Sequence, residues 1–67
     1  MDKIIELNTF LKLQNLASTG GQAKILIRAG EIKVNGEVET RNRRKLHAGD
    51  KIKYQGKVYV VEEEVVR

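Results

Sequence analysis

Four basic side chains stand within five consecutive residues near the middle of the chain, at Arg41, Arg43, Arg44 and Lys45. Cations at this density repel one another unless solvent or an anion surrounds them. A guanidinium group is a planar fork of N–H donors that matches phosphate oxygens, and it also stacks on exposed bases. The run therefore predicts contact with a ligand that carries phosphates. The alternative is a basic loop that meets solvent alone.

Lys24 and Arg28 form a second pair of cations, four residues apart in a segment whose apolar residues have helical spacing. Side chains at this spacing project from the same side of a helix, so the pair can reach successive phosphates. The alternative is a solvated helix face. Gly20 and Gly21 open the same segment, and the free amides at the start of a helix attract anions. Close packing between two helices is the other explanation of these glycines.

The net charge of the 67-residue chain is +4, but the charge is unevenly distributed. Residues 7–61 contain eleven Lys or Arg and four Asp or Glu, a balance of +7, while the remaining acids lie near the two ends. A body this basic favours a polyanionic partner, although the same charge also keeps a small domain in solution.

The composition argues against catalysis and against a metal site. The chain has no Cys and a single His, His47, so we expect neither a disulfide framework nor a metal site. Without a nucleophile and base to work together, the sequence predicts no enzyme activity and no cofactor. No run approaches the ~20 apolar residues that span a bilayer, and the start lacks a signal-peptide pattern. We therefore expect a cytoplasmic monomer without a membrane partner, with one domain over 1–67, a core of about 7–61 and an acidic end at 62–67.

Two helices are predicted ahead of the basic run. Apolar residues recur at helical spacing after the first few positions, and Asn8 fits an N-cap, which predicts a helix over Thr9–Leu16. Thr19 and Gln22 match a capping box, so a second helix begins beside them. Gly30 fits the left-handed residue that ends this second helix.

A hairpin is predicted next, because the apolar pattern begins to alternate and Asn35-Gly36 is a turn signal. A two-residue loop would set Ile32 opposite Glu39 and mix the two faces of the hairpin. A three-residue loop instead pairs Ile32 with Val38, and we predict this second register.

Two further strands are predicted over Lys51–Tyr54 and Lys57–Val61, after turns at Gly49-Asp50 and Gln55-Gly56. The basic run at 41–45 interrupts the apolar pattern and is expected to form a loop. The acidic end at 62–67 either extends the last strand or frays.

The order of these signals resembles a known family. Three segments carry the likeness: Thr-x-x-Gln-Ala-Lys-x-Leu-Ile from Thr19, Gly-Glu-Ile-Lys-Val-Asn-Gly from Gly30, and Ala-Gly-Asp-Lys-Ile from Ala48. Together they look like the RNA-binding domain family of small-subunit ribosomal protein S-four, the alpha-L motif, over about Leu7 to Tyr54. The resemblance implies an α+β fold, with two short N-terminal helices packed on a small, mainly antiparallel sheet. It also implies a short stand-alone bacterial subclass connected with ribosome maturation.

The resemblance implies that RNA binds on the surface of the second helix and the hairpin. Members of the family commonly carry a basic residue where this chain has Gly20, so we expect the contact there to be weaker or to be made differently. The expected function is binding of structured RNA, most directly ribosomal RNA or a ribosomal particle. Its expected site residues are Lys24, Arg28, Arg41, Arg43, Arg44, Lys45, Gly20 and Gly21.

Two other functions remain open. The chain could be a small protein-interaction adaptor, in which a sheet edge or the region from Val58 to Val66 docks a partner and the basic charge serves solubility. DNA binding is supported by the attraction between basic side chains and backbone phosphates, which applies to DNA and RNA alike.

Overall fold

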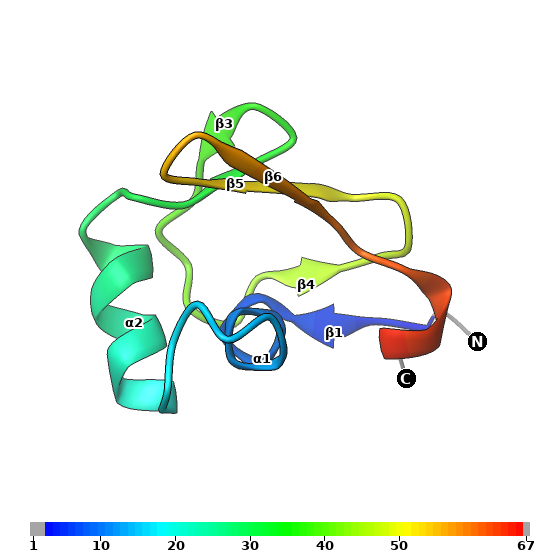
Figure 1. The fold of residues 1–67 in the computed structure, drawn as a ribbon, viewed down its shortest axis with the longest axis horizontal. Coiled ribbons are helices and arrows are strands. Elements are labelled where there is room, and N and C mark those ends of the chain that lie inside the picture. Colours follow the sequence, from blue (N-terminus) through cyan, green and yellow to red (C-terminus); the bar gives the residue numbers. More distant parts are fainter. Residues whose placement is uncertain (1–2, 67) are drawn as a thin grey trace.

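The computed structural model describes residues 3–66. Figure 1 shows the α+β class that was predicted, with the two helices below a small sheet and a short strand ahead of the first helix. The elements in chain order are β1 (Ile5–Glu6), α1 (Leu7–Leu13), α2 (Gly20–Arg28), β2 (Lys33–Val34), β3 (Glu37–Val38), β4 (Lys45–Leu46), β5 (Lys51–Tyr54), β6 (Lys57–Val60) and the 3-10 turn η1 (Glu63–Val65).

Two antiparallel sheets organise the strands. One has four strands in the order β3-β2-β5-β6, and the other pairs β1 with β4, so that Ile5 lies opposite Leu46. The predicted hairpin of β5 and β6 is confirmed, although β6 ends at Val60. The prediction of a loop over 41–45 was wrong at its end, because Lys45 and Leu46 form β4. Strands of two residues carry too little alternation to be recognised from sequence.

Helix α1 begins at Leu7, two residues before the predicted start, and Asn8 is not its N-cap. The first amides of the helix are bound by the backbone of the basic run. The Leu7 N–H donates to the carbonyl of Arg44 at 2.8 Å, and the Asn8 N–H donates to the carbonyl of Asn42 at 3.1 Å. The helix also ends early, because Asn15 adopts a left-handed conformation with φ of 60°.

Helix α2 has the predicted ends. The Thr19 hydroxyl accepts from the Gln22 N–H at 3.1 Å, and the Gln22 side chain accepts in return from the N–H of Ser18 at 2.6 Å. At the other end Gly30 has a φ of 78°, and its N–H donates to the carbonyl of Ile27. This left-handed glycine closes the helix as the sequence predicted.

The register predicted for the β2–β3 hairpin was wrong. Lys33 lies opposite Val38, which is the register of a two-residue loop formed by Asn35 and Gly36. Both loop residues are left-handed, with φ of 52° and 89°, as a type I′ turn requires. This register brings Glu39 beside Ile32 on the inner face, where the Glu39 N–H donates to the Ile32 carbonyl at 2.9 Å.

The hydrophobic core lies between the helices and the inner face of the four-stranded sheet. Its largest fully buried side chains are Phe10, Leu7, Leu11, Ile27, Ile32, Leu46, Ile52 and Val61. Buried Ile5 and Val66 carry this cluster beyond both ends of the 7–61 range that was expected for the core. Across residues 3–66, every helix is too short or too polar to cross a membrane.

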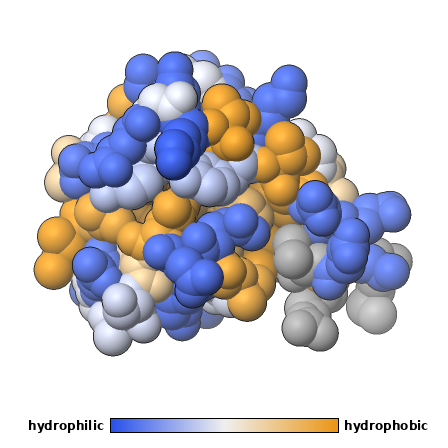
Figure 2. Space-filling view, in the orientation of Figure 1, coloured by the Kyte–Doolittle hydropathy of each residue, from blue (hydrophilic) through white to orange (hydrophobic). Residues whose placement is uncertain are grey.

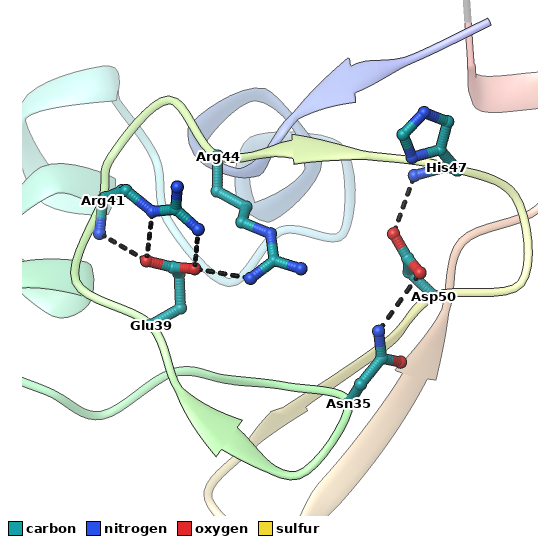
Figure 3. A network of polar contacts seen from close by, with 6 residues as sticks. All are labelled: Asn35, Glu39, Arg41, Arg44, His47 and Asp50. Atoms are coloured by element: carbon teal, nitrogen blue, oxygen red, sulfur yellow. Dashed lines mark hydrogen bonds and ion pairs between the residues drawn. The ribbon is translucent and has the colours of Figure 1, made fainter. Parts of the chain in front are cut away.

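Asn35 joins two turns that are far apart in the sequence (Figure 3). Its side-chain amide donates to the Asp50 carboxylate at 3.2 Å, and its side-chain oxygen accepts from the backbone N–H of Lys51 at 3.0 Å. The second carboxylate oxygen of Asp50 accepts from the N–H of His47 at 2.8 Å. The Asn-Gly and Gly-Asp segments of the sequence are therefore parts of one polar contact.

Replacing Asn35 by Gly separates this contact from the turn conformation. Glycine adopts a left-handed φ without strain, so N35G removes the side-chain bonds and keeps the turn. The lost bonds are expected to lower the free energy of unfolding by about 1 kcal/mol, in addition to the entropic cost that any change to glycine brings. The matched control is Q55G, because Gln55 has nearly the same φ of 51° and its side chain makes no hydrogen bond to residues 3–66. Urea unfolding of both variants makes the comparison. Equal stability of N35G and Q55G would show that the Asn35 side chain contributes nothing.

Candidate nucleic-acid interface

The basic run links β3 to β4 and forms an open hollow. Arg41, Arg43, Arg44 and Lys45 line this hollow, which has a volume of about 390 Å³. The structure thus brings together the four cations that the sequence singled out. Because backbone carbonyls in the run bind the first amides of α1, the hollow is attached to the helix and is not a free loop.

Two acids, buried Glu39 and partly exposed Glu6, bind three of these cations. Arg41 donates three hydrogen bonds to the Glu39 carboxylate. Two come from its guanidinium group at 3.0 Å, and the third comes from its backbone N–H at 2.9 Å. Arg44 donates to the same carboxylate at 2.7 Å, as Figure 3 shows. On the other side of the run, Arg43 binds Glu6 at the end of β1 at 3.0 Å. The repulsion expected within the run is therefore relieved in part by internal anions.

Burial differs strongly between the partners in these ion pairs. The Glu39 side chain is 8% exposed, whereas the Arg41 side chain is 72% exposed. The Arg43 side chain is 78% exposed, and that of Arg44 is 32% exposed. Each arginine therefore turns one edge to an acid and keeps donors that can reach a ligand in solvent.

The charge states of these groups follow from their contacts. The hydrogen bond from Arg41 holds the pKa of the Glu39 carboxyl far below its usual range; burial opposes this effect, and bonds from Arg44 and from the Arg41 backbone add to it. The pKa of Arg41 is raised by the hydrogen bond to Glu39, and that of Arg43 by the bond to Glu6. All three groups are charged at neutral pH.

Lys24 and Arg28 project from α2 as predicted, and both are exposed. Neither forms an ion pair with another of the residues that the structure describes. Figures 1 and 3 both show the segment of Arg41 running beside α2. The basic run therefore passes next to the helix that carries Lys24 and Arg28.

Gly20 and Gly21 form the first turn of α2, but close packing does not require them. A Cβ on Gly21 would meet the Thr19 hydroxyl at 3.8 Å, and one on Gly20 would meet the Lys12 ammonium at 3.9 Å. Both are ordinary contacts, so the packing explanation of these glycines is not supported. Lys12, which comes from α1, places a cation beside Gly20.

Sequence reasoning missed three residues at this surface. Glu6 and Glu39 were not linked to the arginines, because their pairing depends on β1 and on the hairpin register. Lys12 has helical spacing to the apolar residues of α1, but its position next to Gly20 depends on how the helices pack.

These features define a class of protein: a small α+β domain with a cluster of exposed cations, which is typical of domains that bind nucleic acid. The family is more specific, since residues 1–62 match the model of the S4 domain. The chain belongs to the S4 domain family, which is a family of RNA-binding domains. The likeness inferred from the sequence motifs is thereby confirmed.

Two relatives share most of the chain. "Putative RNA-binding protein YbcJ" of Escherichia coli (strain K12) is 46% identical over 52 residues, which are 78% of this chain and 74% of the relative. "Probable ribosome maturation protein RlbA" of Bacillus subtilis (strain 168) is 39% identical over 54 residues, which are 81% of this chain and 76% of the relative. No solved structure matches the chain.

The buried ion pair predicts a defined dependence of stability on pH. Because the pKa of Glu39 is lowered by folding, the unfolded chain binds its proton first, so the stabilisation is complete above about pH 4.5 and declines as the pH falls further. E39Q is expected to lose roughly 1–3 kcal/mol of unfolding free energy at neutral pH. Its deficit should shrink in acid, because the wild type loses the same interaction there.

Urea unfolding of wild type and E39Q between neutral pH and pH 3 tests this prediction. E37Q is the control, since Glu37 lies two residues before Glu39, is exposed, and has no ion-pair partner among the described residues. A deficit for E39Q that is the same at every pH would contradict the assignment of the lowered pKa to Glu39.

Proposed function

We propose that this chain binds structured RNA, with ribosomal RNA or a ribosomal particle as its target, and acts as a single-domain cytoplasmic monomer. The observation that carries the proposal is the hollow lined by Arg41, Arg43, Arg44 and Lys45. The site also includes Lys24 and Arg28 on α2, and the Gly20-Gly21 start of that helix. The printed names of the two relatives, an RNA-binding protein and a ribosome maturation protein, support both the ligand and the setting.

The mode of binding follows from the chemistry of the surface. The base edges of duplex RNA lie in a deep and narrow groove, so a small rigid domain reads the spacing of phosphates more readily than the sequence. Lysine and arginine suit this task, since they donate several hydrogen bonds and carry charge. We therefore assign recognition to backbone contacts and to the shape of a folded RNA.

Lys12 completes the surface at the position where the family has its usual cation. Its ammonium lies 3.9 Å from where a Cβ of Gly20 would stand. In this proposal the missing basic side chain at Gly20 is replaced by one from α1. The two glycines leave the start of α2 uncovered, so that a phosphate can approach the backbone amides.

Titration of a ribosomal RNA fragment across a salt series tests the function. Each phosphate that the protein neutralises releases counterions, so affinity should fall steeply as salt rises. Two double variants, R43Q/R44Q and K24Q/R28Q, each neutralise two cations and should weaken binding by tenfold or more at low salt. The slope of log affinity against log salt concentration should fall by about one for every phosphate-binding cation removed. Absence of binding at low salt, or an affinity that salt does not change, would overturn the proposal.

Matched controls keep this test specific to the surface. K53Q/K57Q removes the same charge from the exposed β5–β6 hairpin and should leave most of the affinity. Thermal melts of all three double variants exclude unfolding as the cause. Equal reductions in affinity from the hairpin pair and from the two site pairs would show that net charge, and not the proposed surface, determines binding.

A second candidate function is supported by the outer face of the four-stranded sheet. One row of side chains across this face consists of Val38, Lys33, Lys53 and Val58. Both valines are exposed, Val38 by 56% and Val58 by 57%. Figure 2 shows apolar surface next to hydrophilic surface along this sheet. Exposed aliphatic side chains gain little from phosphates, so they favour a protein partner and the adaptor function.

A pull-down from a cell extract, repeated after nuclease treatment, separates the two functions. RNA binding predicts that the captured proteins disappear when the RNA is digested. The adaptor predicts that a partner remains, and that replacing Val58 by Asn removes this partner while R43Q/R44Q does not.

A further inference from the structure

Glu39 is an acid in the middle of a surface that is proposed to bind a polyanion. We propose that it is a positioning residue, which fixes Arg41 and Arg44 so that the basic run forms a preorganised binding site for backbone phosphates. This inference rests on the proposed RNA-binding function and adds a residue and a mechanism to it. Its basis is the geometry of the carboxylate and of the two guanidinium groups.

The carboxylate is held too firmly to act as a competitor of RNA. Glu39 is 7% exposed, and it accepts four bonds of 2.7–3.0 Å from two arginines. A phosphate could displace it only if the buried carboxylate gave up these bonds without gaining water, which is unfavourable. The incoming phosphate therefore meets the free edges of the arginines and leaves their pairing with Glu39 intact.

Enough donors remain free for a ligand. An arginine side chain has five N–H donors. Arg41 uses two of them on Glu39, and Arg44 uses one. The remaining donors of both residues belong to side chains that line the hollow of about 390 Å³. The hollow thus offers several fixed donors to one or two phosphate groups.

A second acid, Glu6, orients another of the cations that line the hollow. Arg43 binds the Glu6 carboxylate through both Nε and Nη2 at 3.0 Å. Lys45 lies directly opposite Glu6 in the β1–β4 pair. Glu39 and Glu6 therefore each orient arginines that line the hollow. Phosphates of an RNA backbone are the ligand class that fits, because they bind several fixed N–H donors at once.

Preorganisation and simple electrostatics predict opposite effects for the removal of this acid. If charge alone decided affinity, removing a carboxylate from the site would strengthen the binding of a polyanion. If Glu39 positions the arginines, its removal lets two long side chains move, and they must be ordered again when RNA binds. The sign of the change in affinity therefore distinguishes the two mechanisms.

The experiment measures binding of a ribosomal RNA fragment to wild type, E39Q and E37Q. E39Q is expected to bind about fivefold more weakly, or worse, although its net charge is more positive. Its salt slope should not be smaller than that of wild type, because no cation has been removed. E37Q removes the same charge from an exposed position of the same hairpin and should bind as well as wild type or better.

Two further measurements guard against unfolding of the variants. R41K keeps the charge but lacks the planar fork, and it should weaken binding in the same direction as E39Q. The NMR signal of the Arg41 Nε–H, which donates to Glu39, should be sharp in wild type, shift on addition of inorganic pyrophosphate, and broaden in E39Q. Thermal melts confirm that the variants are folded under the conditions of the titration.

The outcomes separate this inference from the function on which it rests. If wild type fails to bind RNA, both are overturned. If wild type binds and E39Q binds equally well or more tightly, the RNA-binding function stands and the positioning role of Glu39 is rejected. Weaker binding by E39Q with an Arg41 signal as sharp as that of wild type would also reject it, because the arginine would then still be ordered.

Discussion

A buried carboxylate is stable only if cations or hydrogen-bond donors replace the water it has lost. Much of this structure follows from how Arg41 and Arg44 provide these donors to Glu39. The type I′ turn at Asn35-Gly36 sets the register that places Glu39 on the inner face of the hairpin. Arg41 and Arg44 then have to fold back toward it, which shapes the segment between β3 and β4. A local choice of turn thus determines the geometry of the cationic surface.

The basic run contributes to the fold with its backbone and to the surface with its side chains. Its carbonyls at Asn42 and Arg44 take the place of an N-cap side chain for α1, and its last residue, Lys45, begins the strand that pairs with β1. The run is therefore as much a part of the framework as either helix. Attachment of the run to α1 and β1 by its backbone is the structural basis of the preorganisation that we propose.

The features that could be predicted from the sequence are those whose causes are local. The capping box at Thr19, the closing Gly30 and the hairpin over β5 and β6 each depend on a few neighbouring residues. The family segments also indicated the fold class, and the density of Arg and Lys at 41–45 indicated the cations that line the hollow. The β2–β3 register, by contrast, was predicted wrongly, because it places an acid on the inner face, and the sequence did not show that Arg41 and Arg44 would neutralise Glu39 there. Strand β1, the start of α1 and the pairing of Arg43 depend on contacts between the two ends of a long segment, and no local pattern encodes them.

The junction of β1 with β4 has a consequence for how the chain is made. Ile5 pairs with Leu46, and the first amides of α1 donate to the carbonyls of Asn42 and Arg44. These partners are synthesised only after most of the domain, so α1 and β1 lack them until then. Contacts over such a separation are closed late and together. We therefore expect β1 and α1 not to be stable without the later segment, and the domain to fold in one cooperative step.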